Sequence, residues 1–136
     1  LWQYGIWEQI SNQGLHIEQA WSEAVIKLRA YIQDKPEEQK ELENIRPDEL
    51  QKGTGSGYVV DCLHSARWAL QQLNYQDVIK TAIALGNDTD TTACVAGGIA
   101  GLYFGFDAIP QRWKDQLRGQ EIVDAVLQRL FDSDAK

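Results

Sequence analysis

Gly-Asn-Asp-Thr-Asp-Thr-Thr-Ala-Cys-Val-Ala-Gly-Gly-Ile-Ala-Gly-Leu-Tyr-Phe-Gly, residues 86–105, is the stretch of this sequence that decides the fold. It begins with carboxylates and hydroxyls and continues as an uncharged run of small and apolar residues. A run that is apolar on every side predicts a buried helix, because no face of it suits water. We therefore expect a cluster of oxygen ligands at the positive end of a helix inside the protein, where carboxylates need a cation, hydrogen bonds or both.

Helices are also predicted before and after this stretch. Apolar residues recur every three or four positions in residues 17–32, 59–73, 75–85 and 119–131, which is typical of helices with one core-facing side. Residues 1 to about 12 resemble the end of another helix, which stops near Gly14. The predicted core includes Trp21, Val25, Tyr31, Val59, Leu70, Leu73, Val78 and Ala82.

The remaining segments complete an all-α prediction. Residues 37–52 are mostly charged or polar and predict a short solvated helix followed by a connection. Gly97 and Gly101 share one face of the central helix, where small residues let a neighbouring helix approach closely. No segment shows the sustained alternation of a β-strand. We therefore predict helices packed around the Gly/Ala-rich helix.

Size and composition exclude several classes of protein. A chain of 136 residues can bury the core of one domain. The net charge of −7 argues against binding to a nucleic-acid backbone, and no apolar run reaches the roughly 18 residues of a membrane span. Cys62 and Cys94 lie in apolar helical patterns and are predicted to be buried thiols, which indicates a cytoplasmic protein. The chain has no methionine, so we interpret it as a piece of something longer.

The residues at the start of the central helix have two interpretations. Asp88 and Asp90 would not share a face inside a regular helix, but at a helix entry both can turn toward the Thr91 hydroxyl. Carboxylate and hydroxyl oxygens are the ligands that Mg²⁺ and Mn²⁺ favour. Asp and Thr are also good N-cap residues, and capping alone would explain either of them. Spacing by itself favours capping over metal binding.

Gly53-Thr-Gly-Ser-Gly57 precedes the helix predicted from Tyr58 onward. Such a loop could present backbone N–H groups to a phosphate, although it lacks the Lys-Ser/Thr of a Walker loop and the spacing of a dinucleotide fingerprint. Taken alone, it is more simply a flexible linker. His64 follows on the same helix, and we expect it near the surface with no catalytic role.

The motifs together resemble one family. Gly55-Ser-Gly-Tyr-Val-Val-Asp61, Gly86-Asn-Asp-Thr-Asp-Thr91, residues 97–105 and Ile109-Pro-Gln-Arg-Trp113 agree in order and spacing with the ADP-ribosylglycohydrolase family, which includes dinitrogenase-reductase-activating and ADP-ribosylarginine hydrolases. The resemblance implies an all-α hydrolase with two magnesium ions, sometimes manganese, that removes ADP-ribose from modified side chains or cleaves related ADP-ribosyl bonds.

The resemblance also implies roles for residues of both motifs. Asp88, Asp90 and Thr91 would be metal ligands. The loop formed by Gly55, Ser56, Gly57 and Tyr58 would line the ADP-ribose pocket, with backbone amides facing the phosphates and the tyrosine ring packed on the ligand. No general acid or base is assigned by these motifs.

The sequence departs from the family at its N-terminal side. Family members carry a Thr-Asp-Asp metal motif and catalytic acidic residues in their N-terminal half, and no such motif occurs here. Two octahedral ions need about ten to twelve oxygen donors, waters included. We therefore expect residues 1–136 to be the C-terminal portion of a single ADP-ribosylglycohydrolase-like domain, inactive without its N-terminal half.

The expected partners are that half and an ADP-ribosylated protein or ADP-ribosyl small molecule, with no nucleic-acid backbone and no membrane. The alternative is a non-catalytic helical binding or regulatory module that retains the scaffold.

Overall fold

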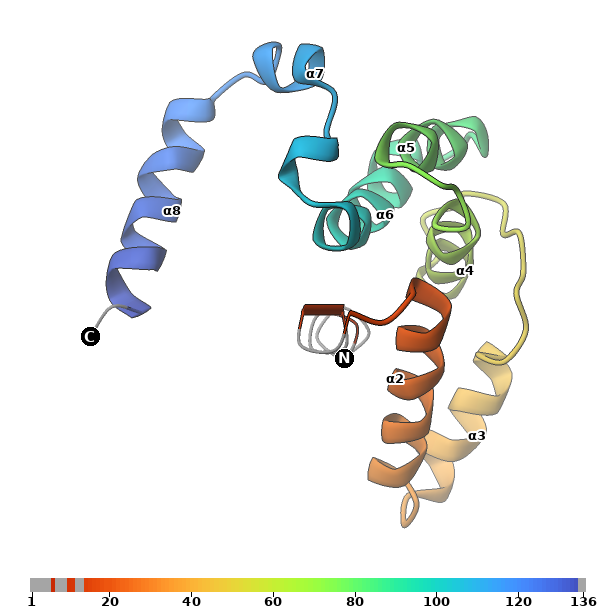
Figure 1. The fold of residues 1–136 in the computed structure, drawn as a ribbon. Coiled ribbons are helices and arrows are strands. Elements are labelled where there is room, and N and C mark those ends of the chain that lie inside the picture. Colours follow the sequence, from red (N-terminus) through yellow and green to blue (C-terminus); the bar gives the residue numbers. More distant parts are fainter. Residues whose placement is uncertain (1–5, 7–9, 12–13, 135–136) are drawn as a thin grey trace.

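The computed structural model describes residues 6, 10, 11 and 14–134. Its elements, shown in Figure 1, are α2 (Ile17–Tyr31), α3 (Pro36–Ile45), α4 (Val59–Ala69), α5 (Tyr75–Ala84), α6 (Thr89–Phe104), the short 3-10 helix η1 (Phe106–Ala108), α7 (Gln111–Asp115) and α8 (Gln120–Asp134). No strand occurs in this part of the chain, so the all-α prediction is confirmed. The helix predicted before Gly14 falls mostly outside the described residues.

Local signals explain where several helices begin and end. Pro36 is the first residue of α3, a position where its missing N–H costs nothing. Asn74 caps α5, because its side chain accepts a 2.9 Å hydrogen bond from the amide of Asp77. Gly86 follows α5 with a φ of +81°, a conformation that side chains resist. These boundaries agree with the ranges 37–52 and 75–85 that the sequence predicts for the two helices.

The central layer consists of α4, α5 and α6, which pack against one another (Figure 1). A Cβ on Gly97 would lie 3.0 Å from Ile79 Cδ1 and 3.3 Å from the Tyr75 hydroxyl oxygen, so α5 approaches the glycine face of α6 closely. Gly101 faces the same tyrosine ring. The prediction that small residues on this face admit a neighbouring helix is confirmed.

Arg67 joins α2 and the α3–α4 connection to this layer. Arg67 is only 4% exposed and its side chain lies over the Trp21 ring, with 4.4 Å between the guanidinium carbon and the ring centroid. It donates to Glu18 Oε2 at 2.7 Å and to the Pro47 carbonyl at 2.8 Å. The indole N–H of Trp21 donates to the same carbonyl at 2.7 Å. A buried charge is tolerated here because a carboxylate and carbonyls surround it.

Most of the predicted core residues of α2, α4 and α5 are buried, and the exceptions lie near helix ends. Trp21, Val25, Leu70, Val78 and Ala82 are buried as expected. Three other predicted core residues, Tyr31, Val59 and Leu73, are exposed. Each lies at or just beyond the end of a helix, where the apolar period continues but no neighbouring element covers it.

Three further predictions from the sequence are corrected. The central helix α6 is buried on one side only, because α4 and α5 cover Ala96 and Ala100 while Gly98 stays exposed. Cys94 is consequently exposed, whereas Cys62 is a buried free thiol as predicted. His64, which was expected near the surface, is buried at 3% exposure, and its Nε2 lies 2.7 Å from the Ile45 carbonyl oxygen.

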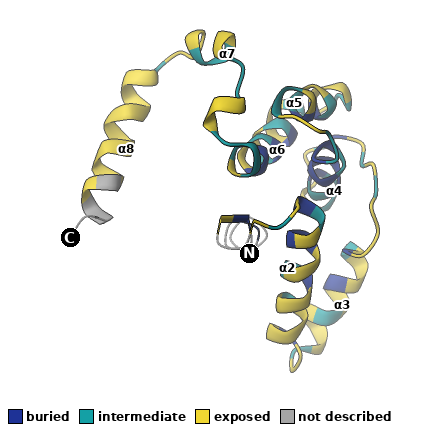
Figure 2. Ribbon diagram, in the orientation of Figure 1, coloured by how far each residue is buried: buried dark blue, intermediate teal, exposed yellow. Residues whose placement is uncertain are grey.

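The last helix, α8, lies apart from the central layer (Figure 1), and almost all of it is coloured as exposed in Figure 2. The predicted apolar stripe is present, but its side chains are 40–67% exposed: Ile122, Val123, Val126, Leu127 and Leu130. None of the described helices combines the length and the apolar composition needed to cross a membrane.

Candidate functional site

The predicted metal ligands lie at the N-terminal end of α6. Asp88 directly precedes the helix, and Asp90 and Thr91 belong to its first turn. Asp88 is half-buried, while Asp90 and Thr91 are exposed. The expectation that this cluster lies inside the protein is therefore wrong, because the covered side of α6 begins at Thr92. Desolvation alone does not require a cation here.

Asp88 occupies the N-cap position of α6 without acting as a cap. Its side chain accepts no hydrogen bond of capping geometry from the first turn. The pKa of Asp88 is nevertheless lowered, chiefly because the Thr91 hydroxyl interacts with its carboxylate. Asp88, Asp90 and Thr91 are thus neighbours at the start of α6, and no capping bond accounts for Asp88.

Gly57 faces this cluster from the loop before α4. A Cβ on Gly57 would lie 2.5 Å from Asp88 Oδ2, closer than real Cβ atoms approach other heavy atoms. The missing side chain therefore leaves room for the carboxylate. This contact joins the two motifs that the sequence analysis singled out separately.

Asp61, in the first turn of α4, holds the loop through four hydrogen bonds. Its Oδ1 accepts from the Thr54 amide at 2.8 Å, and its Oδ2 accepts from the Ser56 amide at 2.7 Å. The hydroxyls of the same two residues donate to Oδ2 at 3.0 and 2.9 Å. Burial acts to raise the pKa of Asp61, but these hydrogen bonds outweigh it and lower the pKa below its ordinary value.

The loop is also bonded to the turn that carries Asp88. The Asp88 amide donates to the Gly55 carbonyl at 2.8 Å, and Asn87 Nδ2 donates to the Thr54 carbonyl at 3.0 Å. The Gly55 amide donates to the buried Ser65 hydroxyl oxygen at 3.0 Å. Residues 53–57 are thus fixed by bonds to α4 and to the 86–88 turn, which is not the arrangement of a flexible linker. Sequence reasoning gave no role to Asp61; its place in the first turn after the glycine loop was the available signal.

These bonds change which loop amides a ligand could use. The amides of Thr54, Gly55 and Ser56 donate within the protein, so they do not face outward as the sequence prediction expected. Within the described part of the chain, the amides of Gly57 and Tyr58 have no acceptor. The Tyr58 side chain is 67% exposed, which leaves its ring accessible. Donors for an anion therefore begin at Gly57.

The donor set suits a hard divalent cation in kind but not in number. Two carboxylates and a hydroxyl, from Asp88, Asp90 and Thr91, are oxygen ligands of the type that Mg²⁺ prefers. Among the described residues, no group of three or more His, Cys, Asp or Glu side chains could hold a metal ion. A complete metal site would need ligands beyond these three residues.

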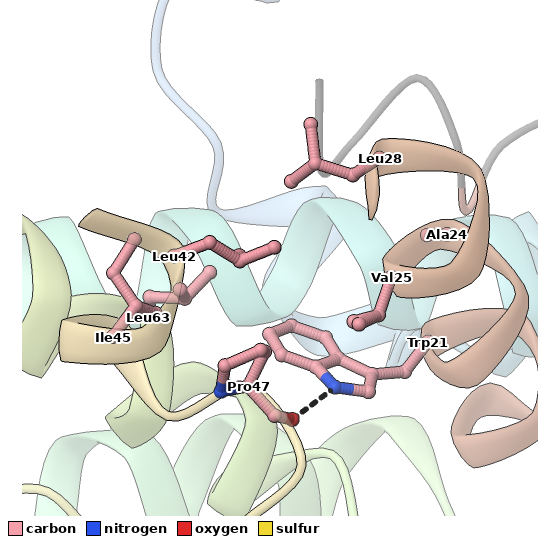
Figure 3. A pocket seen from close by; sticks show the side chains of 8 residues that line it. All are labelled: Trp21, Ala24, Val25, Leu28, Leu42, Ile45, Pro47 and Leu63. Carbon is pink, nitrogen blue, oxygen red and sulfur yellow. Dashed lines mark hydrogen bonds between the residues drawn. The ribbon is translucent and has the colours of Figure 1, made fainter. Parts of the chain in front are cut away.

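An apolar pocket of about 150 Å³ lies elsewhere, between α2, α3 and α4 (Figure 3). None of the predicted site residues lines it; its lining residues are Trp21, Ala24, Val25, Leu28, Leu42, Ile45, Pro47 and Leu63. The one side-chain donor among them, the Trp21 indole, already donates to the Pro47 carbonyl, as the dashed line in Figure 3 marks. The pocket therefore offers no group for catalysis.

Comparison with known proteins identifies the family. The sequence model described as ADP-ribosylglycohydrolase matches residues 2–136. The chain belongs to the ADP-ribosylglycohydrolase family. The chain is 42% identical to the ADP-ribosylarginine hydrolase Tri1 of Serratia proteamaculans over 77 residues, which are 56% of this chain and 21% of that protein. The ADP-ribosylhydrolase ARH3 of Danio rerio is 46% identical over 54 residues, or 40% of this chain and 15% of that protein.

The human ADP-ribosylhydrolase ARH3 matches this ADP-ribosylglycohydrolase chain at 47% identity over 49 residues, 36% of the chain and 14% of the human protein. The chain thus aligns with about a fifth or less of the length of these curated relatives. No solved structure gives a significant match.

Proposed function

We propose that this chain forms the C-terminal part of a magnesium-dependent hydrolase that removes ADP-ribose from modified protein side chains or from related ADP-ribosyl compounds. Family membership and the printed activities of the relatives support the reaction class. The observation that carries the proposal for this chain is the contact between the Asp88 cluster and the Gly55–Tyr58 loop. A cation site that lies next to a nucleotide site suits a substrate that presents both ribose hydroxyls and a diphosphate.

The residues of the cluster would bind metal ions, and those of the loop would bind the ADP-ribose. Asp88, Asp90 and Thr91 would contribute oxygen ligands to a centre of two magnesium ions, with manganese as a substitute. When bound, the ions would hold the ribose hydroxyls and stabilise the charge that develops as the glycosidic bond breaks. The amides of Gly57 and Tyr58 would donate to diphosphate oxygens, and the Tyr58 ring would pack on the ligand.

The remaining metal ligands and the general acid or base would come from an N-terminal half. The exposed face of α6 that begins at Asp90 continues through Cys94, Gly98 and Leu102, because residues four apart lie on the same side of a helix. Metal ligands from an N-terminal half could approach Asp90 over this open face. The chain alone would accordingly be a poor catalyst.

The Asp90→Ala substitution tests this function in the protein that includes the N-terminal half. Loss of one carboxylate ligand should weaken Mg²⁺ binding by at least the roughly 10- to 100-fold seen when a group supporting a metal ligand is removed. Release of ADP-ribose should fall in parallel. Asp107→Ala, at an exposed aspartate in η1, is the matched control.

Calorimetric titration with Mg²⁺ and an ADP-ribose release assay give the two readings. Full activity and unchanged Mg²⁺ affinity in Asp90→Ala would refute the assigned role. A protein that binds ADP-ribose with Mg²⁺ but hydrolyses no ADP-ribosyl bond would instead be the non-catalytic binding module.

A further inference from the structure

Hydrogen bonds from two different segments support the loop of residues 54–57. The carboxylate of Asp61 holds the amides and hydroxyls of Thr54 and Ser56. The 86–88 turn holds the carbonyls of Thr54 and Gly55 through Asn87 and the Asp88 amide. The loop is therefore the physical link between a residue of α4 and the turn that carries a proposed metal ligand.

We propose that Asp61 is a positioning residue that couples the metal-binding turn to the ADP-ribose loop, so that Mg²⁺ and ADP-ribose each strengthen binding of the other. This inference rests on the proposed function. A metal bound at Asp88 restrains the 86–88 turn, and the turn's hydrogen bonds then restrain Gly55. Because Asp61 anchors the other side of the loop, that restraint fixes the position of Gly57 and Tyr58. Coupling of this kind acts equally in both directions.

The geometry explains why an amide cannot replace this carboxylate. Both carboxylate oxygens accept from a backbone N–H, Oδ1 from Thr54 and Oδ2 from Ser56. Asparagine would present its NH₂ group to one of these two amides, and a backbone amide cannot reverse its role as a hydroxyl can. Asp61→Asn therefore releases one end of the loop while it preserves the size of the side chain.

Asp77 provides a matched control. It is the third residue of α5, as Asp61 is the third residue of α4, so both carboxylates have the same relation to a helix N-terminus. The Asp77 carboxylate accepts a hydrogen bond from the Asn74 side chain, and the Asp77 amide donates one to the Asn74 side-chain oxygen. Both bonds lie at the start of α5. Asp77→Asn thus removes an equivalent charge without touching the loop.

The experiment measures ADP-ribose affinity by calorimetry in the protein that includes the N-terminal half, with Mg²⁺ and again with EDTA. In Asp61→Asn the affinity with Mg²⁺ should fall on the order of tenfold, as expected for loss of one charge-assisted hydrogen bond. The ratio of the two affinities should move toward one, and KM should change more than kcat. Asp77→Asn should keep the parent values.

Amide hydrogen exchange gives a reading that needs no ligand. Exchange at the Ser56 and Asp88 amides should accelerate in Asp61→Asn and not in Asp77→Asn. If Asp61→Asn fails to fold, Thr54→Val removes one hydroxyl bond to Asp61 and should give a smaller change of the same sign.

The outcomes separate this inference from the proposed function. A parent protein that binds no ADP-ribose under either condition refutes the proposed function. A parent protein that binds it, with Asp61→Asn showing the same affinity ratio and the same amide exchange, overturns the positioning role and leaves the proposed function standing.

Discussion

Gly57→Ala should damage the metal site without damaging the fold. The added Cβ would lie 2.5 Å from Asp88 Oδ2, while ordinary contact begins at 3.4 Å, so the carboxylate or the loop must move by about 0.9 Å. The loop resists because Asp61 holds the amides of Thr54 and Ser56, so the carboxylate is the part that moves. Metal ligands tolerate deviations of only about 0.2 Å from their ordinary distances.

The expected size of the effect follows from that displacement. A misplacement of about 1 Å typically costs on the order of 100-fold in rate, and we expect a loss of Mg²⁺ affinity of about 10- to 100-fold with it. Stability should change little, because the backbone of Gly57 lies outside the left-handed region and accepts alanine.

Gly101→Ala is the matched control for this substitution. Gly101 lies inside α6 on the side that faces α5, and the nearest atom to the added Cβ is Tyr75 Cε2 at 3.9 Å, an ordinary contact. Alanine there should stabilise the helix by about 0.5–1 kcal/mol and leave Mg²⁺ affinity unchanged. Calorimetric Mg²⁺ titration and urea denaturation measure both quantities. If Gly57→Ala keeps the parent Mg²⁺ affinity, the argument that its missing side chain makes room for a metal ligand is refuted.

Two further predictions concern stability. Arg67→Met should lower the free energy of unfolding by about 3–5 kcal/mol, because Glu18 loses its charge partner. Arg29→Met, in the exposed pair with Asp48, should lower it by less than about 1 kcal/mol. Equal losses of the two variants in urea denaturation would contradict this prediction. The lowered pKa of Asp61 means that its stabilisation is present above the unfolded pKa, near 3.8, and is lost as pH falls through the lower folded value. The stability deficit of Asp61→Asn, measured by urea midpoints, should therefore be largest near neutral pH and shrink below pH of about 4, and a constant deficit would exclude this origin.

Features encoded by neighbouring residues were predictable from the sequence. The apolar period located α2, α4 and α5, and Pro36 and Asn74 marked helix starts where the structure has them. A proline ring or a capping side chain acts on a backbone only a few residues away, so its effect survives in most tertiary contexts. The close approach of α5 to Gly97 was predictable for a similar reason, since small residues on one helix face have few other uses.

Features that depend on partners distant in sequence were not predictable. Arg67 was not expected to be buried, because its partners Glu18 and Pro47 lie 49 and 20 residues away. The exposure of one side of α6 was not predicted, because an apolar helix is buried only where other elements pack against it. The exposure of Cys94 and of the Asp90 carboxylate follows from the same fact.

The glycines of the 53–57 loop show how one pattern supports opposite structures. Alternating glycines suggested a flexible linker, yet each glycine meets a different neighbour. A Cβ on Gly53 would lie 2.8 Å from the Ser65 backbone nitrogen, and one on Gly55 would lie 2.7 Å from the Gly86 carbonyl oxygen. Together with the contact of Gly57 with Asp88, these approaches bring α4 and the 86–88 turn against the loop. The glycines here permit close packing, so the segment with the fewest side chains is among the most constrained in the site.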